Sequence, residues 1–126
     1  MDAKEKKTIG ILGGMGPEAT SLFFQKIIRF TPARKDQDHL KVIIYNDPGI
    51  PDRTASILSN QESPVSRAKA GLKHLEKCGS DFIVIPCVTI HFYYEELKNS
   101  ISRPVLNIIE ESAMHVKTKF PGTKRI

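Results

Sequence analysis

Short apolar runs alternate with segments of helical periodicity along this chain. Apolar runs bounded by glycine, proline or polar residues predict buried strands, and apolar residues recurring every three or four positions predict amphipathic helices. The predicted strands cover residues 8–12, 41–45, 82–86 and 104–107. The predicted helices begin at Pro17, after Pro64, near Thr89 and near Ile109, and they end before Pro32, at Gly79, near Ser100 and near Lys119.

This order of elements indicates an α/β fold. We expect an open, mostly parallel sheet of about four strands, with right-handed crossovers and helices on both faces. A chain of 126 residues fits one domain. Residues 1–7 are predicted to be a charged tail and residues 8–126 to form the domain. Residues 46–59 are predicted to be a loop, and residues 120–126 are predicted to be a turn leading into another strand.

Composition excludes several classes of protein. The net charge is +5, but the basic excess lies near the two ends of the chain, without the interleaved aromatic residues of a nucleic-acid binding surface. No apolar run approaches the roughly 20 residues of a membrane span. No apolar signal region follows the charged N-terminus, so we expect a cytoplasmic protein. Two cysteines are too few for a disulfide scaffold or a zinc cluster.

Cys87 is the main candidate for chemistry. It follows the third predicted strand, and the carboxyl ends of parallel strands are where open α/β folds bind ligands. A thiol there also faces the first amides of the next helix, which favour a thiolate. Cys78 precedes the same strand and is predicted to lie at the opposite edge, about 20 Å away at ~3.3 Å per strand residue. We expect Cys78 to be a packed or half-exposed thiol.

Three other segments follow predicted strands: residues 13–17, residues 46–54 and residues 107–111. All of them would face the same edge of the sheet as Cys87. Residues 14–19 also fit the dinucleotide fingerprint G-x-G-x-x-A, with Asp47 where a ribose-binding acid would lie. That alternative is weak, because Pro17 removes an amide that a pyrophosphate would bind and because Cys87 is left without a role.

Together these segments resemble the N-terminal half of the aspartate/glutamate racemase family, and most closely its aspartate racemase branch. The resemblance rests on residues 9–17, 46–54, 82–91 and 104–111. It implies a racemase that needs no cofactor and no metal and that acts on a small acidic amino acid. In this family one cysteine thiolate removes the Cα proton, and a second thiol on the opposite face returns one.

The resemblance also implies roles for individual residues. Cys87 matches the first catalytic cysteine, and Arg53 matches the arginine that grips the side-chain carboxylate of the substrate, which suits a bidentate guanidinium. Val88 stands where the family usually has an asparagine that binds the substrate's α-groups, and losing one such bond costs on the order of 1–3 kcal/mol. The remaining positions that match the substrate-binding site are Met15, Asn46, Thr54 and Thr89.

Family members have two similar domains, and the second supplies the partner cysteine. We expect that second domain to be absent here, which leaves two hypotheses. Either the chain is an acidic amino-acid racemase, or it is a truncated, catalytically inactive domain that binds a small dicarboxylate or amino acid. A homodimer would rescue the first hypothesis, since two copies related by a twofold axis would set Cys87 against Cys87.

Two further interpretations stay open. His91 either orients groups near Cys87 or caps or packs on a helix. Glu110 and Glu111 either belong to the site or reflect the preference for acids in a first helical turn, and the second interpretation is favoured. The other histidines, at 39, 74 and 115, show no ligand-like spacing and are predicted to lie at the surface.

Overall fold

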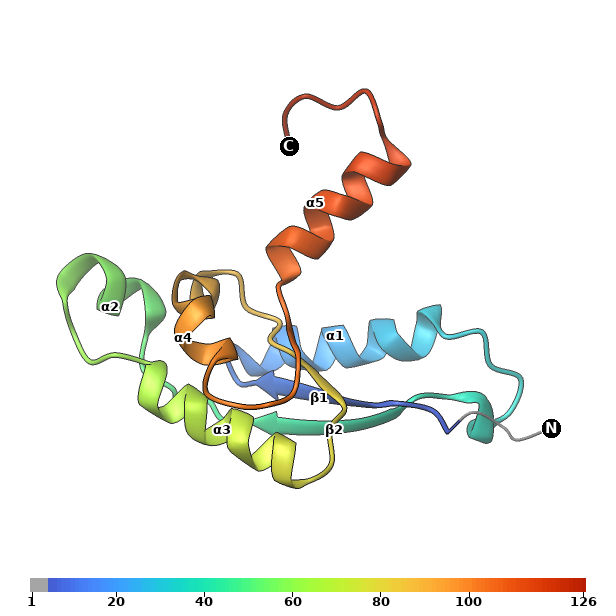
Figure 1. Ribbon diagram of the computed structural model, residues 1–126, viewed down its shortest axis with the longest axis horizontal. Coiled ribbons are helices and arrows are strands. Elements are labelled where there is room, and N and C mark those ends of the chain that lie inside the picture. The colour runs from blue at the N-terminus through green and yellow to red at the C-terminus, as the bar shows by residue number, and fades with distance from the viewer. Residues whose placement is uncertain (1–4) are drawn as a thin grey trace.

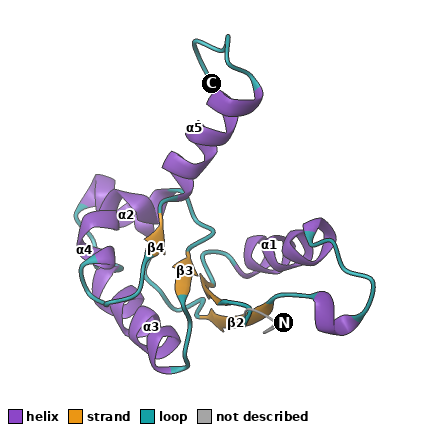
Figure 2. Ribbon diagram, turned by 45° about the vertical axis from the view of Figure 1, so that its right-hand side comes forward, coloured by secondary structure: helices purple, strands orange, loops and turns teal. Residues whose placement is uncertain are grey.

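The fold is built on a four-stranded parallel sheet in the order β2-β1-β3-β4, seen in a computed structural model that describes residues 5–126 (Figure 2). Its strands are β1 (Thr8–Gly13), β2 (Lys41–Asn46), β3 (Phe82–Val84) and β4 (Val105–Leu106). Its helices are α1 (Pro17–Phe30), α2 (Arg53–Ser59), α3 (Val65–Lys77), α4 (Tyr94–Lys98) and α5 (Ile108–Lys119), with 3-10 turns η1 (Asp36–Asp38) and η2 (Thr89–Tyr93). The predicted α/β class is therefore confirmed.

The central strand β1 is buried on both faces, as its unbroken apolar sequence requires. Ile9 and Ile11 point to one face, where they pack with Val84 and the half-buried apolar residues of α1. Leu12 points to the other face, into the core that α3 and α4 cover. Helix α1 thus lies on one side of the sheet, with α3 and α4 on the other (Figures 1 and 2).

Helix α3 packs through one apolar stripe against the sheet. Ala68, Leu72 and Leu75 recur at intervals of four and three residues, and each is at most 1% exposed. The helix sits close to the strands because Gly71 has no side chain: a Cβ atom there would lie 2.6 Å from Cδ1 of Leu12. Gly79 follows the helix with a φ of +89°, the left-handed conformation that glycine favours at such an end.

This packing gives a direct test of the core. Leu72 is fully buried, so Leu72→Ala is expected to lower the free energy of unfolding by about 2–5 kcal/mol. Leu58 is 78% exposed, and Leu58→Ala is the matched control, with an expected change within about 0.5 kcal/mol. Urea denaturation followed by circular dichroism measures both. Equal effects at the two positions would contradict the assignment of the core.

Helix α5 projects away from the rest of the domain (Figure 1). Asn107 caps it, because its Oδ1 accepts hydrogen bonds from the N–H groups of Ile109 at 3.0 Å and Glu110 at 3.2 Å. No side chain of α5 is buried. Within residues 5–126, no helix combines the length and apolar character that crossing a bilayer would need.

Two predictions for residues 46–86 differ from the structure. The predicted loop over residues 46–59 contains α2, because Asp52 accepts a hydrogen bond from the Ala55 N–H at 2.6 Å and so caps a helix. The third strand ends at Val84 rather than at Pro86, since proline has no N–H to donate and the Cys87 N–H turns back to the Ile85 carbonyl at 2.8 Å.

The third predicted helix also differs from the structure. The single helix predicted over residues 89–100 is a 3-10 turn, η2, followed by the five-residue α4. The side chains of Ile90 and His91, which are neighbours in η2, are both buried. Residues 120–126 form a turn followed by an irregular segment, and no further strand forms within the described chain.

Candidate active site

The segments that follow β1, β2 and β3 meet at one edge of the sheet, because the carboxyl ends of these parallel strands lie there. The strand order reverses direction between β1 and β3, and such a switch point is where open α/β sheets bind ligands. Gly13 ends β1 opposite Asn46, which ends β2. The Asp47 N–H then donates to the Gly13 carbonyl at 3.0 Å, so the loops that follow β1 and β2 start side by side.

The turn after β1 is fixed by local hydrogen bonds. The Gly14 N–H donates to Oγ1 of Thr20 at 3.0 Å, and that hydroxyl donates to the Gly16 carbonyl at 3.0 Å. Met15 is 7% exposed and belongs to the same buried cluster as Cys87 and Ile50. The side chain of this predicted substrate-contact residue therefore packs into the core beneath the edge rather than standing free at the surface.

Cys87 lies three residues beyond the end of β3, and its side chain is largely shielded. The residue is 7% exposed, and its Sγ atom lies 3.4 Å from Oγ1 of Thr89. Either the thiol or the hydroxyl can be the donor at that distance. The predicted long helix after Cys87 is the 3-10 turn η2, so fewer aligned peptide dipoles face the thiol than a full helix would provide.

Arg53 is the first residue of α2, and its guanidinium has hydrogen-bond partners for Nη1 but not for Nε among residues 5–126. Nη1 donates to the carbonyls of Ile50 at 3.3 Å and Pro51 at 3.2 Å. Nε is buried and has no hydrogen-bond partner among residues 5–126. A buried N–H without a partner calls for an explanation, and a carboxylate is the acceptor that a guanidinium fits best.

Helix α2 is held against the segment that follows Cys87. The hydroxyls of Ser56 and Tyr93 lie 2.7 Å apart and join α2 to the end of η2. This contact places the Arg53 helix beside the turn that begins at Thr89. Sequence reasoning did not identify Ser56 or Tyr93, because neither residue stands at a strand end.

Four of the predicted site residues, Thr89 among them, present their side chains to solvent. Asn46 and Thr54 are exposed, and so is Val88, which is 66% exposed directly beside the buried Cys87. Val88 also lines a hollow of about 350 Å³ together with Ile108 and other residues of α5. The residue that departs from the family's asparagine thus stands at the surface next to the thiol.

Asp47, the candidate ribose ligand of the dinucleotide alternative, forms an ion pair with Arg67. Its two carboxylate oxygens accept from Nε and Nη2 of Arg67 at 2.6 and 2.9 Å, and one of them also accepts from the Gly49 N–H at 2.9 Å. The hydrogen bonds from Arg67 lower the pKa of this carboxyl below its ordinary value. The ion pair fixes the loop after β2, a role that the sequence pattern did not reveal.

The structure gives no support for a site role of the remaining candidates among residues 5–126. Cys78 ends α3 and is exposed at the opposite edge of the sheet. Glu110 and Glu111 are exposed in the first turn of α5, in agreement with the favoured interpretation of helix-terminal acids. Among residues 5–126, no three histidine, cysteine, aspartate or glutamate side chains gather as metal ligands would.

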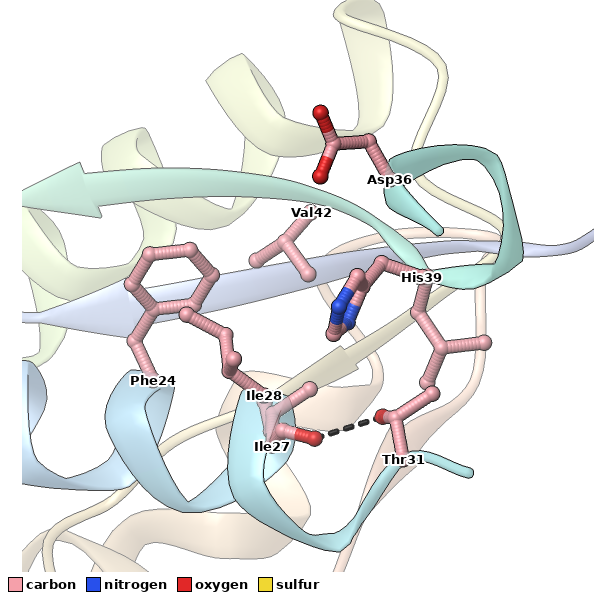
Figure 3. A pocket seen from close by; sticks show the side chains of 8 residues that line it. Phe24, Ile27, Ile28, Thr31, Asp36, His39 and Val42 are labelled. Atoms are coloured by element: carbon pink, nitrogen blue, oxygen red, sulfur yellow. Dashed lines mark hydrogen bonds between the residues drawn. The ribbon is translucent and has the colours of Figure 1, made fainter. Parts of the chain in front are cut away.

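A separate apolar hollow of about 270 Å³ lies between α1 and the start of β2 (Figure 3). Phe24, Ile27 and Val42 line it, and the half-buried ring of His39 points into it, although His39 was predicted to be at the surface. This hollow is at the amino end of β2, whereas Cys87 follows the carboxyl end of β3. It is therefore not part of the candidate site.

The fold and the site define an α/β domain that carries a shielded thiol beside the switch point of its sheet. Residues 12–126 match the family described as Asp/Glu/Hydantoin racemase, and the chain belongs to this family. The resemblance inferred from the sequence is thereby confirmed.

Two relatives show the extent of the similarity. The broad specificity amino-acid racemase RacX of Bacillus subtilis (strain 168) is 38% identical, over 86% of this chain and 48% of its own length. The aspartate racemase of Picrophilus torridus is 41% identical and superposes with a TM-score of 0.85, over 90% of this chain and 48% of that structure. This chain thus spans about half the length of these relatives.

A more distant structure supports the fold alone. An aspartate racemase homologue from Pyrococcus horikoshii OT3 is 23% identical, with a TM-score of 0.75 over 90% of this chain and 50% of that one.

Proposed function

We propose that this domain supplies one half of the active site of a cofactor-independent amino-acid racemase, with Cys87 as a proton-transfer group. The observation that carries the proposal is the placement of a nearly buried thiol at the ligand-binding edge of the sheet, 3.4 Å from the hydroxyl of Thr89. Membership of the racemase family supports the same chemistry. A cytoplasmic setting would suit it, because a reducing compartment keeps thiols free.

The proposed step is a proton transfer at the Cα atom of the substrate. The Cys87 thiolate takes the Cα proton, an S–H bond forms, and the electron pair of the broken C–H bond moves toward the α-carboxylate. Return of a proton to the opposite face of the planar intermediate inverts the configuration. In the proposed step the Thr89 hydroxyl, 3.4 Å from Sγ, donates to the thiolate before the transfer, since a thiolate can only accept a hydrogen bond.

An acidic amino acid is the proposed substrate. Arg53 is half-buried and has a buried Nε–H group without a partner among residues 5–126. A side-chain carboxylate that reaches the Arg53 guanidinium would gain a charge-assisted hydrogen bond. The relative RacX is described as having broad specificity, so the assay below includes neutral amino acids as well as aspartate and glutamate.

The second proton-transfer group has to come from outside this domain. Cys78 does not qualify, because it is exposed at the opposite edge of the sheet. We propose a homodimer in which a second copy presents its own Cys87 to the opposite face of the substrate. Analytical ultracentrifugation tests this arrangement, and a strictly monomeric species at assay concentration would contradict it.

A second candidate function is a domain that binds a small dicarboxylate or amino acid without racemising it. The observation that favours it is Val88, whose side chain offers no hydrogen bond where the family usually has asparagine. In that case Arg53 would still bind a carboxylate, and Cys87 would take no part. Ligand binding without proton exchange distinguishes this candidate from the racemase.

The deciding experiment follows the Cα proton. The purified chain is incubated with L-aspartate in heavy water, with Cα deuterium followed by NMR and D-aspartate by chiral chromatography, and parallel incubations use L-glutamate and neutral amino acids. Deuterium together with D-aspartate is expected for a complete two-thiol site. Deuterium confined to L-aspartate would show that Cys87 acts as a lone base. Neither signal, with aspartate binding detected by calorimetry, would favour the binding domain.

Restoring asparagine at position 88 is expected to strengthen the site. Val88 is 66% exposed, so Val88→Asn removes little buried apolar surface, and one added hydrogen bond of about 1–3 kcal/mol raises kcat/KM by roughly tenfold to a hundredfold. Val88→Leu, which adds no hydrogen-bonding group, is the matched control. The same Cα exchange assay measures both variants, and equal rates would argue against an α-group contact at this position.

A further inference from the structure

His91 is a buried titratable residue that the proposed proton transfer does not use. Its ring lies between two backbone groups from segments 21 positions apart in the chain: Nδ1 is 2.7 Å from the carbonyl oxygen of Cys87, and Nε2 is 3.3 Å from the backbone nitrogen of Ile108. The residue is 8% exposed. The imidazole thus connects the residue that carries the thiol with the first residue of α5.

The two partners determine where the ring holds its proton. A carbonyl oxygen only accepts hydrogen bonds, and a backbone N–H only donates them. His91 satisfies both partners only as the neutral imidazole with its proton on Nδ1, which donates to Cys87, while Nε2 accepts from Ile108. Any other protonation state leaves one of these contacts without its hydrogen bond.

The ring is also fixed by its neighbour on one face. The aromatic ring of Tyr94 stacks on it with centroids 5.9 Å apart and planes inclined by 6°. The Tyr94 hydroxyl in turn donates to the carbonyl of Val105 in β4 at 2.7 Å. The imidazole therefore has a defined position relative to β4, to α5 and to the turn after Cys87.

We infer that His91 is a positioning residue, which holds the Cys87 backbone and the start of α5 at a fixed spacing and so sets the direction of the thiol. This inference rests on the proposed function in so far as it concerns catalysis. Its structural content is that the Cys87 carbonyl is held through Nδ1–H of His91. Because a misplacement of about 1 Å can cost about 100-fold in rate, loss of this hydrogen bond is expected to lower kcat.

Two substitutions separate the two hydrogen bonds. Asparagine places its amide near the position of Nδ1, so His91→Asn keeps a donor for the Cys87 carbonyl. Glutamine places its amide near the position of Nε2, so His91→Gln keeps an acceptor for the Ile108 N–H and loses the contact to Cys87. We expect His91→Gln to lower kcat for Cα exchange about 100-fold with little change in KM, and His91→Asn to recover most of that loss. Equal losses in the two variants would overturn the inference.

Two readouts do not depend on racemase activity. Two-bond ¹H–¹⁵N correlation spectra of the wild-type chain are expected to show the His91 proton on Nδ1, and a proton on Nε2 would overturn the inference. Iodoacetamide labelling followed by mass spectrometry compares Cys87 with the exposed Cys78 in the same molecule. The ratio of the two rates is expected to change in His91→Gln and to stay near the wild-type ratio in His91→Asn.

These readouts keep the two proposals distinguishable. A wild-type chain with the Nδ1–H tautomer and the expected labelling ratios, but without Cα exchange, would refute the racemase function and support the positioning of Cys87. Cα exchange that both variants retain at the wild-type rate would support the racemase and refute the role of His91.

Discussion

Replacing Cys87 by serine is expected to abolish measurable Cα proton exchange while leaving the fold intact. A serine hydroxyl ionises far less readily than a thiol, so the base is lost while the side chain keeps nearly the same size. Proton transfer by a positioned side chain contributes about 10²–10⁴ in rate, and the expected loss is of that order. The measurement is the rate of Cα deuterium incorporation, with circular dichroism as the check on folding.

The chain contains its own control for this experiment. Cys78 is the other cysteine, and it is exposed at the opposite edge of the sheet. Cys78→Ser is expected to leave the exchange rate unchanged. A large loss in Cys78→Ser, or full exchange in Cys87→Ser, would mean that the thiol at the strand end is not the base.

A large loss of stability is also expected when Gly14, in the turn after β1, is replaced by alanine. The φ of Gly14 is +103°, and a Cβ atom there would lie 2.3 Å from the carbonyl carbon of Asp47. Gly14→Ala is therefore expected to cost about 1–3 kcal/mol from the backbone conformation alone, with a further loss because the chain at Asp47 has to move. Urea denaturation measures this loss of stability.

Gly14→Ala is also expected to weaken the site, because the loops that follow β1 and β2 start side by side. The Asp47 N–H bonds to the Gly13 carbonyl at 3.0 Å, and displacement of Asp47 carries Asn46 with it. Gly16→Ala is the matched control: a Cβ atom there would meet no atom of residues 5–126 within 4 Å, and its φ of −105° suits alanine. A change within about 1 kcal/mol is expected for the control, because Gly16 is the N-cap of α1, a position where alanine is less favourable than glycine. Similar losses in both variants would show that crowding at Asp47 is not the cause.

Hydrogen bonds between the loops give the proposed half-site a defined shape. Gly13 and Asp47 join the first two loops, and the contact between Ser56 and Tyr93 joins α2 to the segment after Cys87. Val88 stays exposed beside the thiol. The site is therefore an ordered surface at one edge of the sheet, which suits a half-site completed by a second copy, as proposed above.

Strand and helix order followed from the sequence because local patterns encode them directly. The unbroken apolar run of β1 and the three-and-four spacing of Ala68, Leu72 and Leu75 each admit one buried arrangement. Helix α2 was missed although its signal is present, since Asp52 is a suitable cap three residues before Ala55. The proline-rich sequence before it favoured a loop.

Local sequence patterns were sufficient for the parallel α/β fold, the family of the chain and the position of Cys87 just beyond the third strand, because strand periodicity and chain order require no distant contacts. The folded structure was needed to find that His91 bonds to both Cys87 and Ile108, that Arg67 pairs with Asp47, and that Nε of Arg53 has no hydrogen-bond partner among residues 5–126. The physical reason is that each of these features depends on hydrogen bonds between residues in different elements. Such pairings arise from the packing of those elements, and no local spacing in the chain encodes them.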